Sequence, residues 1–242
     1  MLNLNHLIYN LSKLIVQYSN YKIIIEYDGT DFVGWQRQDN GLSIQELIEV
    51  AIQKLTNKET SIFGAGRTDA GVHAKGQVAS FKLENYLDAN TIRDGLNHHL
   101  RPHPIAILSA IEVNDDFNAR FSAKLRWYEY QVVNRRSPLT LENNRVWCVH
   151  KNINVKKIIE ESKKFIGKHD LSAFRSINCQ SKSAIKSINS IDVKKNEEEI
   201  EHTRVTGKQG FIEGFLIAFL NPKIAAWTFA LFSQFVSPNA TI

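Results

Sequence analysis

Several strand-like segments of this sequence follow one another without a helix between them. Residues 61–63 (SIF) and 77–83 (QVASFKL) are of this kind, and the loop between them, GAGRTDAGVHAKG, has no helical periodicity. Parallel strands need a crossover, usually through a helix, whereas antiparallel strands need only a turn or loop. We therefore predict an α+β fold of sheets covered by helices, not a doubly wound parallel fold. Further strands are expected at 21–30, 105–113, 125–134 and 183–195.

Three segments carry the periodicity of helices that cover such sheets. Ser43 has the residue type of an N-cap, and Glu46 lies at the capping-box distance from it. The apolar residues that follow share one helical face: Ile44, Leu47, Ile48, Ala51, Ile52 and Leu55. We predict two further helices, at 90–100 and at 155–167, the second ending at Gly167.

The glycine-rich loop holds a lone Arg67 and a lone Asp69 among small residues. A dinucleotide fingerprint fails, because Asp69 stands where a third small residue is needed and would repel a pyrophosphate. A P-loop fails as well, because Val72 and His73 stand where Lys and Ser or Thr are required. Two interpretations stay open from the loop alone. Asp69 is a nucleophile or general base that Arg67 keeps ionised, or the two form a structural pair that holds a β-turn.

Other features of the sequence limit the kinds of partner and of reaction that we expect. The formal net charge of +5 favours a polyanion such as nucleic acid. His98, His99 and His103 lie close together, but Pro102 breaks the helix that would align them on a metal. There is no GxSxG motif of a serine hydrolase. The apolar stretch 211–236 is interrupted by polar residues, so we expect no membrane span.

Four motifs occur in an order that resembles the tRNA pseudouridine synthase A family. They are EYDGT with GWQRQ (26–38), GAGRTDAGVHAKGQ (64–77), DDFNARFSAK with RWYEY (115–130), and HDLSAFRS with CQS (169–181). The resemblance implies isomerisation of uridine to pseudouridine at positions 38–40 of the tRNA anticodon stem-loop. It implies two RRM-like (ferredoxin-like) subdomains with the active-site cleft between them. A cytoplasmic homodimer that binds tRNA is expected, without metal or organic cofactor.

The resemblance also assigns roles to individual residues. Asp69 matches the catalytic aspartate, Arg67 the arginine paired with it, and Tyr128 the tyrosine that packs against the target base. Three arginines within the matching motifs are candidate phosphate contacts: Arg120, Arg126 and Arg175. The small residues around Asp69 fit a pocket that admits a uridine flipped out of its stack.

The last part of the chain departs from this pattern. After about Ile200 the resemblance fades, and no HxxVR-like motif follows. A diverged helix with a lost segment would explain this, and so would a frameshift near residue 200, which the abruptness of the change favours. We expect an extension at 1–20, subdomains at 21–113 and 114–200, and a divergent segment at 201–242 that leaves the second sheet incomplete. The alternative function is a catalytically impaired RNA-binding remnant.

Overall fold

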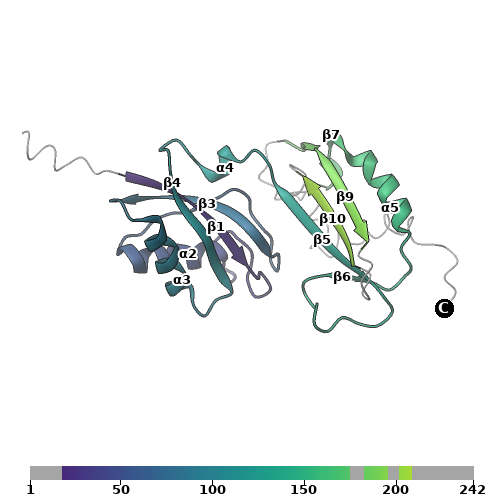
Figure 1. Ribbon diagram of the computed structural model, residues 1–242, viewed down its shortest axis with the longest axis horizontal. Coiled ribbons are helices and arrows are strands. Elements are labelled where there is room, and N and C mark those ends of the chain that lie inside the picture. Colours follow the sequence, from purple (N-terminus) through teal and green to yellow (C-terminus); the bar gives the residue numbers. More distant parts are fainter. Residues whose placement is uncertain (1–17, 175–182, 196–201, 209–242) are drawn as a thin grey trace, which may run out of the picture. The chain divides into compact units, whose positions relative to one another are not determined.

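The computed structural model describes residues 18–174, 183–195 and 202–208, and it confirms an α+β fold, in which all strand pairs but one are antiparallel. The chain divides into two compact units, Met1–Ala123 and Lys124–Ile242 (Figure 1). We expected the boundary near residue 113, which is the last residue of strand β4 (Ile105–Val113), whereas the first unit extends to Ala123. The segment after β4 belongs to the first unit, because the Asn20 amide donates to the carbonyls of Asn114 and Phe117 at 2.8 and 2.9 Å.

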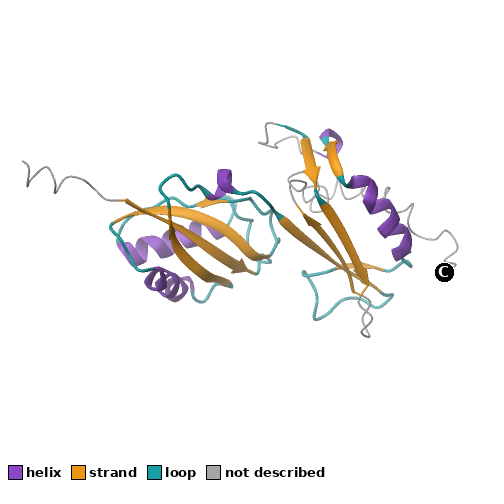
Figure 2. Ribbon diagram, turned by 45° about the horizontal axis from the view of Figure 1, so that its top comes forward, coloured by secondary structure: helices purple, strands orange, loops and turns teal. Residues whose placement is uncertain are grey.

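The first unit is a four-stranded antiparallel sheet with two helices on one face (Figure 2). In spatial order the strands are β2 (Phe63–Gly64), β3 (Ala74–Glu84), β1 (Tyr18–Tyr27) and β4. The helices are α2 (Ile44–Thr56) and α3 (Ala89–Leu100), and a short α4 (Ala119–Ser122) follows β4. All three strand pairs of this sheet are antiparallel. For β2 and β3, the helix-free loop between them predicted this pairing.

Alternation along β1 defines the core of this unit. Tyr21, Ile23, Ile25 and Tyr27 are buried and point to the same face of the sheet. Residues of β3 and of the two helices pack against them: Ile44, Ile48, Ile52, Ala79, Phe81, Leu83, Ile92, Leu96 and Leu100. The burial of this apolar surface holds the helices on the sheet.

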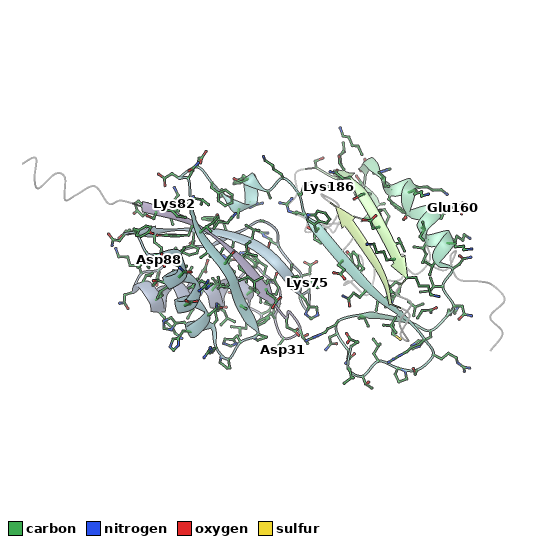
Figure 3. All side chains as sticks on the ribbon, viewed as in Figure 1. Asp31, Lys75, Lys82, Asp88, Glu160 and Lys186 are labelled. Carbon is green, nitrogen blue, oxygen red and sulfur yellow. The ribbon has the colours of Figure 1, made fainter. Side chains whose placement is uncertain are left out.

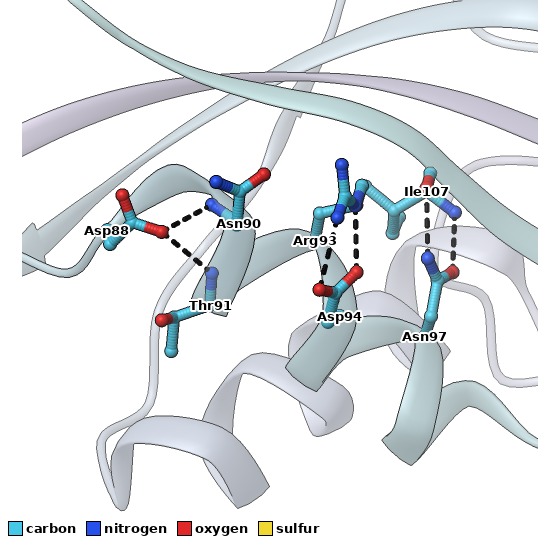
Figure 4. Close-up of polar contacts among 7 residues, drawn as sticks. All are labelled: Asp88, Asn90, Thr91, Arg93, Asp94, Asn97 and Ile107. Atoms are coloured by element: carbon cyan, nitrogen blue, oxygen red, sulfur yellow. Dashed lines mark hydrogen bonds and ion pairs between the residues drawn. The ribbon is translucent and has the colours of Figure 1, made fainter.

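Helices α2 and α3 each begin at a side-chain cap. The Ser43 hydroxyl accepts the Glu46 amide at 3.2 Å, which confirms the N-cap predicted for α2. Figure 4 shows the equivalent cap on α3, where one carboxylate oxygen of Asp88 accepts two backbone amides. It also shows the Asn97 side chain bonded to both backbone groups of Ile107, at 3.0 and 2.8 Å. This pair of hydrogen bonds fastens α3 to the edge strand β4.

In its described residues, the second unit holds two sheets and one α-helix. The larger sheet has the order β6 (Trp147–Val149), β5 (Trp127–Asn134), β10 (His202–Lys208) and β9 (Ser190–Lys195). The smaller sheet pairs β7 (Gly167–Asp170) with β8 (Ile185–Ile188). The described part of this unit also contains helix α5 (Val155–Ser162) and the 3-10 turns η1 (Lys163–Phe165) and η2 (Ser172–Phe174). None of the described helices is long and apolar enough to cross a membrane.

Three expectations for this unit need correction. The helix predicted at 155–167 ends at Ser162, and Gly167 instead opens β7 at a φ of +115°. The single strand predicted at 183–195 is two strands that belong to different sheets. A strand was expected to be missing after residue 200, yet β10 pairs with both β5 and β9. The rest of the divergent segment, 209–242, lies outside the described residues, as does 1–17.

Helix α2 offers a matched test of this core. Ile48 has an exposed fraction of 0% and Val50, on the same helix, 38%. Ile48→Ala should lower the free energy of unfolding by about 2–5 kcal/mol, because it removes buried methyl groups and leaves a cavity. Val50→Ala should change it by less than about 0.5 kcal/mol. Urea denaturation of both variants measures the difference, and equal losses would contradict the assigned core.

Candidate functional site

The loop between β2 and β3 places Asp69 at a corner of the chain. The Val72 amide donates to the Asp69 carbonyl at 3.2 Å, which closes a β-turn. Gly71, the third residue of this turn, has a φ of +77°, and Ala70 before it does not have a positive φ. A turn with a positive φ at its third residue alone is of type II, which favours glycine there. The Asp69 side chain is half-buried at the first position of the turn.

A second segment, residues 28–38, lies directly against this loop. The Trp35 amide donates to the Thr68 carbonyl at 2.9 Å, and the Gly71 amide donates to the Phe32 carbonyl at 3.2 Å. Between these two bonds, Gly34 and Asp69 form an isolated antiparallel bridge. The loop is therefore held on both sides of Asp69 by backbone hydrogen bonds. In Figure 3, Asp31 and Lys75 mark the end of the first unit where the two segments meet, away from Lys82 and Asp88.

Glycines allow this close approach. A Cβ on Gly34 would lie 2.5 Å from the Thr68 carbonyl oxygen, and the residue has a φ of +111°. A Cβ on Gly29 would lie 2.0 Å from the Val72 carbonyl oxygen, so the backbone of the loop excludes any side chain at this position too. The two sequence motifs EYDGT and GWQRQ thus supply the glycines against which the Asp69 loop packs.

A buried tyrosine contacts the loop from the core. The Tyr27 hydroxyl lies 2.8 Å from the Thr68 hydroxyl, and its ring centroid is 6.4 Å from that of the buried Trp35. Burial raises the pKa of Tyr27 to about 12, while hydrogen bonds from Thr68 and Gln77 oppose that rise. The Gln77 amide also donates to the Gly66 carbonyl at 2.7 Å. The loop is therefore fastened at residues 66 and 68, on either side of Arg67.

This arrangement explains the spacing of the two charged residues. Thr68 is directed into the unit toward Tyr27, and in an extended segment the residues on either side of it share the opposite face. Arg67 is exposed and Asp69 half-buried, in keeping with that direction. A guanidinium and a carboxylate two positions apart can then act on one ligand. Their direct pairing stays a prediction.

The other predicted site residues lie in separate parts of the fold. Arg120 is exposed in α4 of the first unit, with its guanidinium carbon 5.7 Å from the centroid of the Phe121 ring. Arg126 directly precedes β5, and Tyr128 is half-buried within β5, paired with Gly207 of β10. Arg175 lies outside the described residues. In the described part of the chain, no group of three or more His, Cys, Asp or Glu side chains is placed to hold a metal ion.

The residues that hold the loop were not predicted from the sequence. Tyr27 was assigned to a strand only, and Thr68 and Gln77 received no role. One signal was present: Tyr27 ends the buried face of β1, and a tyrosine there needs a partner for its hydroxyl. The partner itself, 41 positions away in the sequence, carried no local signal.

Comparisons with known proteins agree on one family. A family model described as tRNA pseudouridine synthase matches residues 23–122 and 162–214. The protein named tRNA pseudouridine synthase A of Parvibaculum lavamentivorans is 50% identical over 181 residues, 75% of this chain and 74% of that protein. The proteins of the same name from Ehrlichia chaffeensis and Paramagnetospirillum magneticum are 49% and 47% identical, over 74% of this chain in each case. The family match extends past residue 200, so the resemblance continues further than the sequence analysis placed it.

The contact between the two segments can be tested at Gly34. Gly34→Ala should lower the free energy of unfolding by about 2 kcal/mol, because alanine is strained at this φ and its Cβ meets the Thr68 carbonyl. Gly76→Ala is the control, since its Cβ would lie 3.8 Å from the nearest atom, the Cγ2 of Ile24. Thermal unfolding and limited proteolysis of the loop measure both variants. A Gly34 variant as stable and as protected as the Gly76 variant would contradict this packing.

Proposed function

The chain belongs to the tRNA pseudouridine synthase family, and we propose that it isomerises uridine to pseudouridine in tRNA through the carboxylate of Asp69. The observation that carries the role of Asp69 is its place at a turn whose backbone is bonded to Phe32 and Trp35 on either side. A catalytic group must be held within a fraction of an ångström of its target, and such a corner provides that rigidity.

The reaction is an isomerisation, so the product has the same atomic composition as the substrate. The bond between N1 of the uracil and C1′ of the ribose breaks, the base turns, C5 bonds to C1′, the C5 proton is lost to solvent and N1 takes up a proton. A carboxylate assists by attacking the sugar or the base, or by taking a proton from the sugar. Each route requires an ionised Asp69, and the guanidinium of Arg67 favours that state. The uridine must first leave its stack to reach the loop.

Further assignments follow from the family resemblance. We propose that Tyr128 packs its ring against the uracil and that Arg120, Arg126 and Arg175 contact phosphates. Positions 38–40 of the anticodon stem-loop are the proposed targets, the two units the proposed RRM-like subdomains, and a cytoplasmic homodimer the proposed assembly. The RNA-binding remnant considered from the sequence is not favoured, because the relatives that carry the family name match three quarters of the chain.

Asp69→Asn tests the proposed function directly. The substitution keeps the size of the side chain and removes its charge, so release of tritium from tRNA labelled at C5 of uridine should become undetectable. Affinity for tRNA should change by less than about threefold, because phosphate contacts supply most of the binding. Filter binding measures that affinity. Substantial tritium release by the variant would exclude Asp69 as the catalytic carboxylate.

Tyr128→Phe separates the ring of that residue from its hydroxyl. If the hydroxyl transfers a proton, kcat should fall by about 100-fold although the ring still stacks on the uracil. Single-turnover tritium release measures the rate of the chemical step. Tyr130→Phe is the control, since Tyr130 is half-buried on the same strand. An unchanged rate in Tyr128→Phe would restrict Tyr128 to stacking.

A further inference from the structure

The hydroxyl of Tyr27 makes a contact that packing alone does not require. Tyr27 is the last residue of β1 and has an exposed fraction of 3%. A phenylalanine would fill the same apolar space, so the hydroxyl is the part of the side chain that needs explanation. It lies 2.8 Å from the hydroxyl of Thr68, the residue directly before Asp69. A buried hydroxyl is costly unless it is hydrogen-bonded, and here its bond is to the loop.

We propose that Tyr27 is a positioning residue that sets the place of the Asp69 carboxylate through its hydrogen bond to Thr68. The proposal rests on the function proposed above and adds a residue to it. Thr68 is held twice, by its side chain to Tyr27 and by its carbonyl to the Trp35 amide at 2.9 Å. The first bond orients the side chain of Thr68 and the second fixes its peptide group. Together they determine the direction in which the next residue leaves the backbone.

The surroundings of Tyr27 suit a positioning role and not proton transfer. Burial raises the pKa of Tyr27 to about 12, so the phenol keeps its proton at neutral pH. The Gln77 amide donates to the Gly66 carbonyl at 2.7 Å, so side chains of the first unit hold the loop at residue 66 as well as at residue 68. A neutral, buried and hydrogen-bonded hydroxyl has little freedom to move, so it can fix the position of Thr68.

Tyr27→Phe has a matched control in Tyr21→Phe. Tyr21 lies on the same face of β1 with an exposed fraction of 0%, and its hydroxyl is hydrogen-bonded to the backbone of Leu87, away from the Asp69 loop. Both variants should lower the melting temperature to a similar extent. Only Tyr27→Phe should lower kcat for tRNA, by about 10- to 100-fold, since small misplacement of a catalytic group has effects of that size. Its KM should stay within about twofold of the wild type.

Substitutions at Thr68 give a second measurement. Thr68→Val removes the hydroxyl at constant shape and should lower kcat as Tyr27→Phe does, whereas Thr68→Ser should keep most of the rate. The double variant Tyr27→Phe with Thr68→Val should be no slower than either single variant, because both remove one shared interaction. Additive losses, or an equal fall of kcat in Tyr21→Phe, would overturn the proposal.

Amide hydrogen exchange separates this proposal from the proposed function. The Gly71 and Val72 amides, which bond to the Phe32 and Asp69 carbonyls, should exchange at least about tenfold faster in Tyr27→Phe than in Tyr21→Phe. This measurement needs no substrate and no activity. A wild-type protein that releases no tritium would refute the proposed function and leave this test intact. Unchanged exchange and unchanged kcat in Tyr27→Phe would refute the positioning role.

Discussion

The candidate site depends on two backbone segments that approach each other with no side chain between them. Gly34 and Gly29 stand where any Cβ would collide with a carbonyl of the Asp69 loop. Because the approach is that close, the amides of Trp35 and Gly71 reach carbonyls across the gap and hold the turn from both sides. The hydrogen bond between Tyr27 and Thr68 joins the buried core to the loop. The residue next to Asp69 is therefore held by a side chain of the sheet. Rigid support of this kind is what a catalytic group on a loop otherwise lacks.

The local parts of the fold could be predicted from the sequence, because their signals lie within a few residues. The cap at Ser43 and the apolar face after it specify α2, and the helix begins at the next residue. The helix-free connection between β2 and β3 indicated antiparallel pairing, which the structure confirms. Arg67 and Asp69 also stand out in the sequence, since two charges among small residues are rarely placed there for packing, and their catalytic role stays a prediction.

The errors lie where distant contacts decide the structure. Residues 183–195 were predicted to form one strand, yet the chain passes from the smaller sheet to the larger one between β8 and β9. Gly167 has the residue type that ends a helix, but in the structure it is the first residue of β7, where it has a positive φ. The partners of Tyr27 are set by the folding of the whole first unit, so its hydroxyl was not recognised as part of the site. A tyrosine in a strand has the same sequence signal whether it holds a loop or fills the core.

The position of β10 bears on the order in which the molecule forms during synthesis. Val205 of β10 pairs with Tyr130 of β5, about 75 residues earlier in the chain, and on its other edge with Val193 of β9. The last of the described strands to emerge from the ribosome is therefore an inner member of its sheet. All pairings among the described strands of the first unit can form once β4 has been made, before the second unit has been synthesised. Pairings of long sequence separation form slowly, and until β10 arrives the facing edges of β5 and β9 are exposed to other chains and to chaperones.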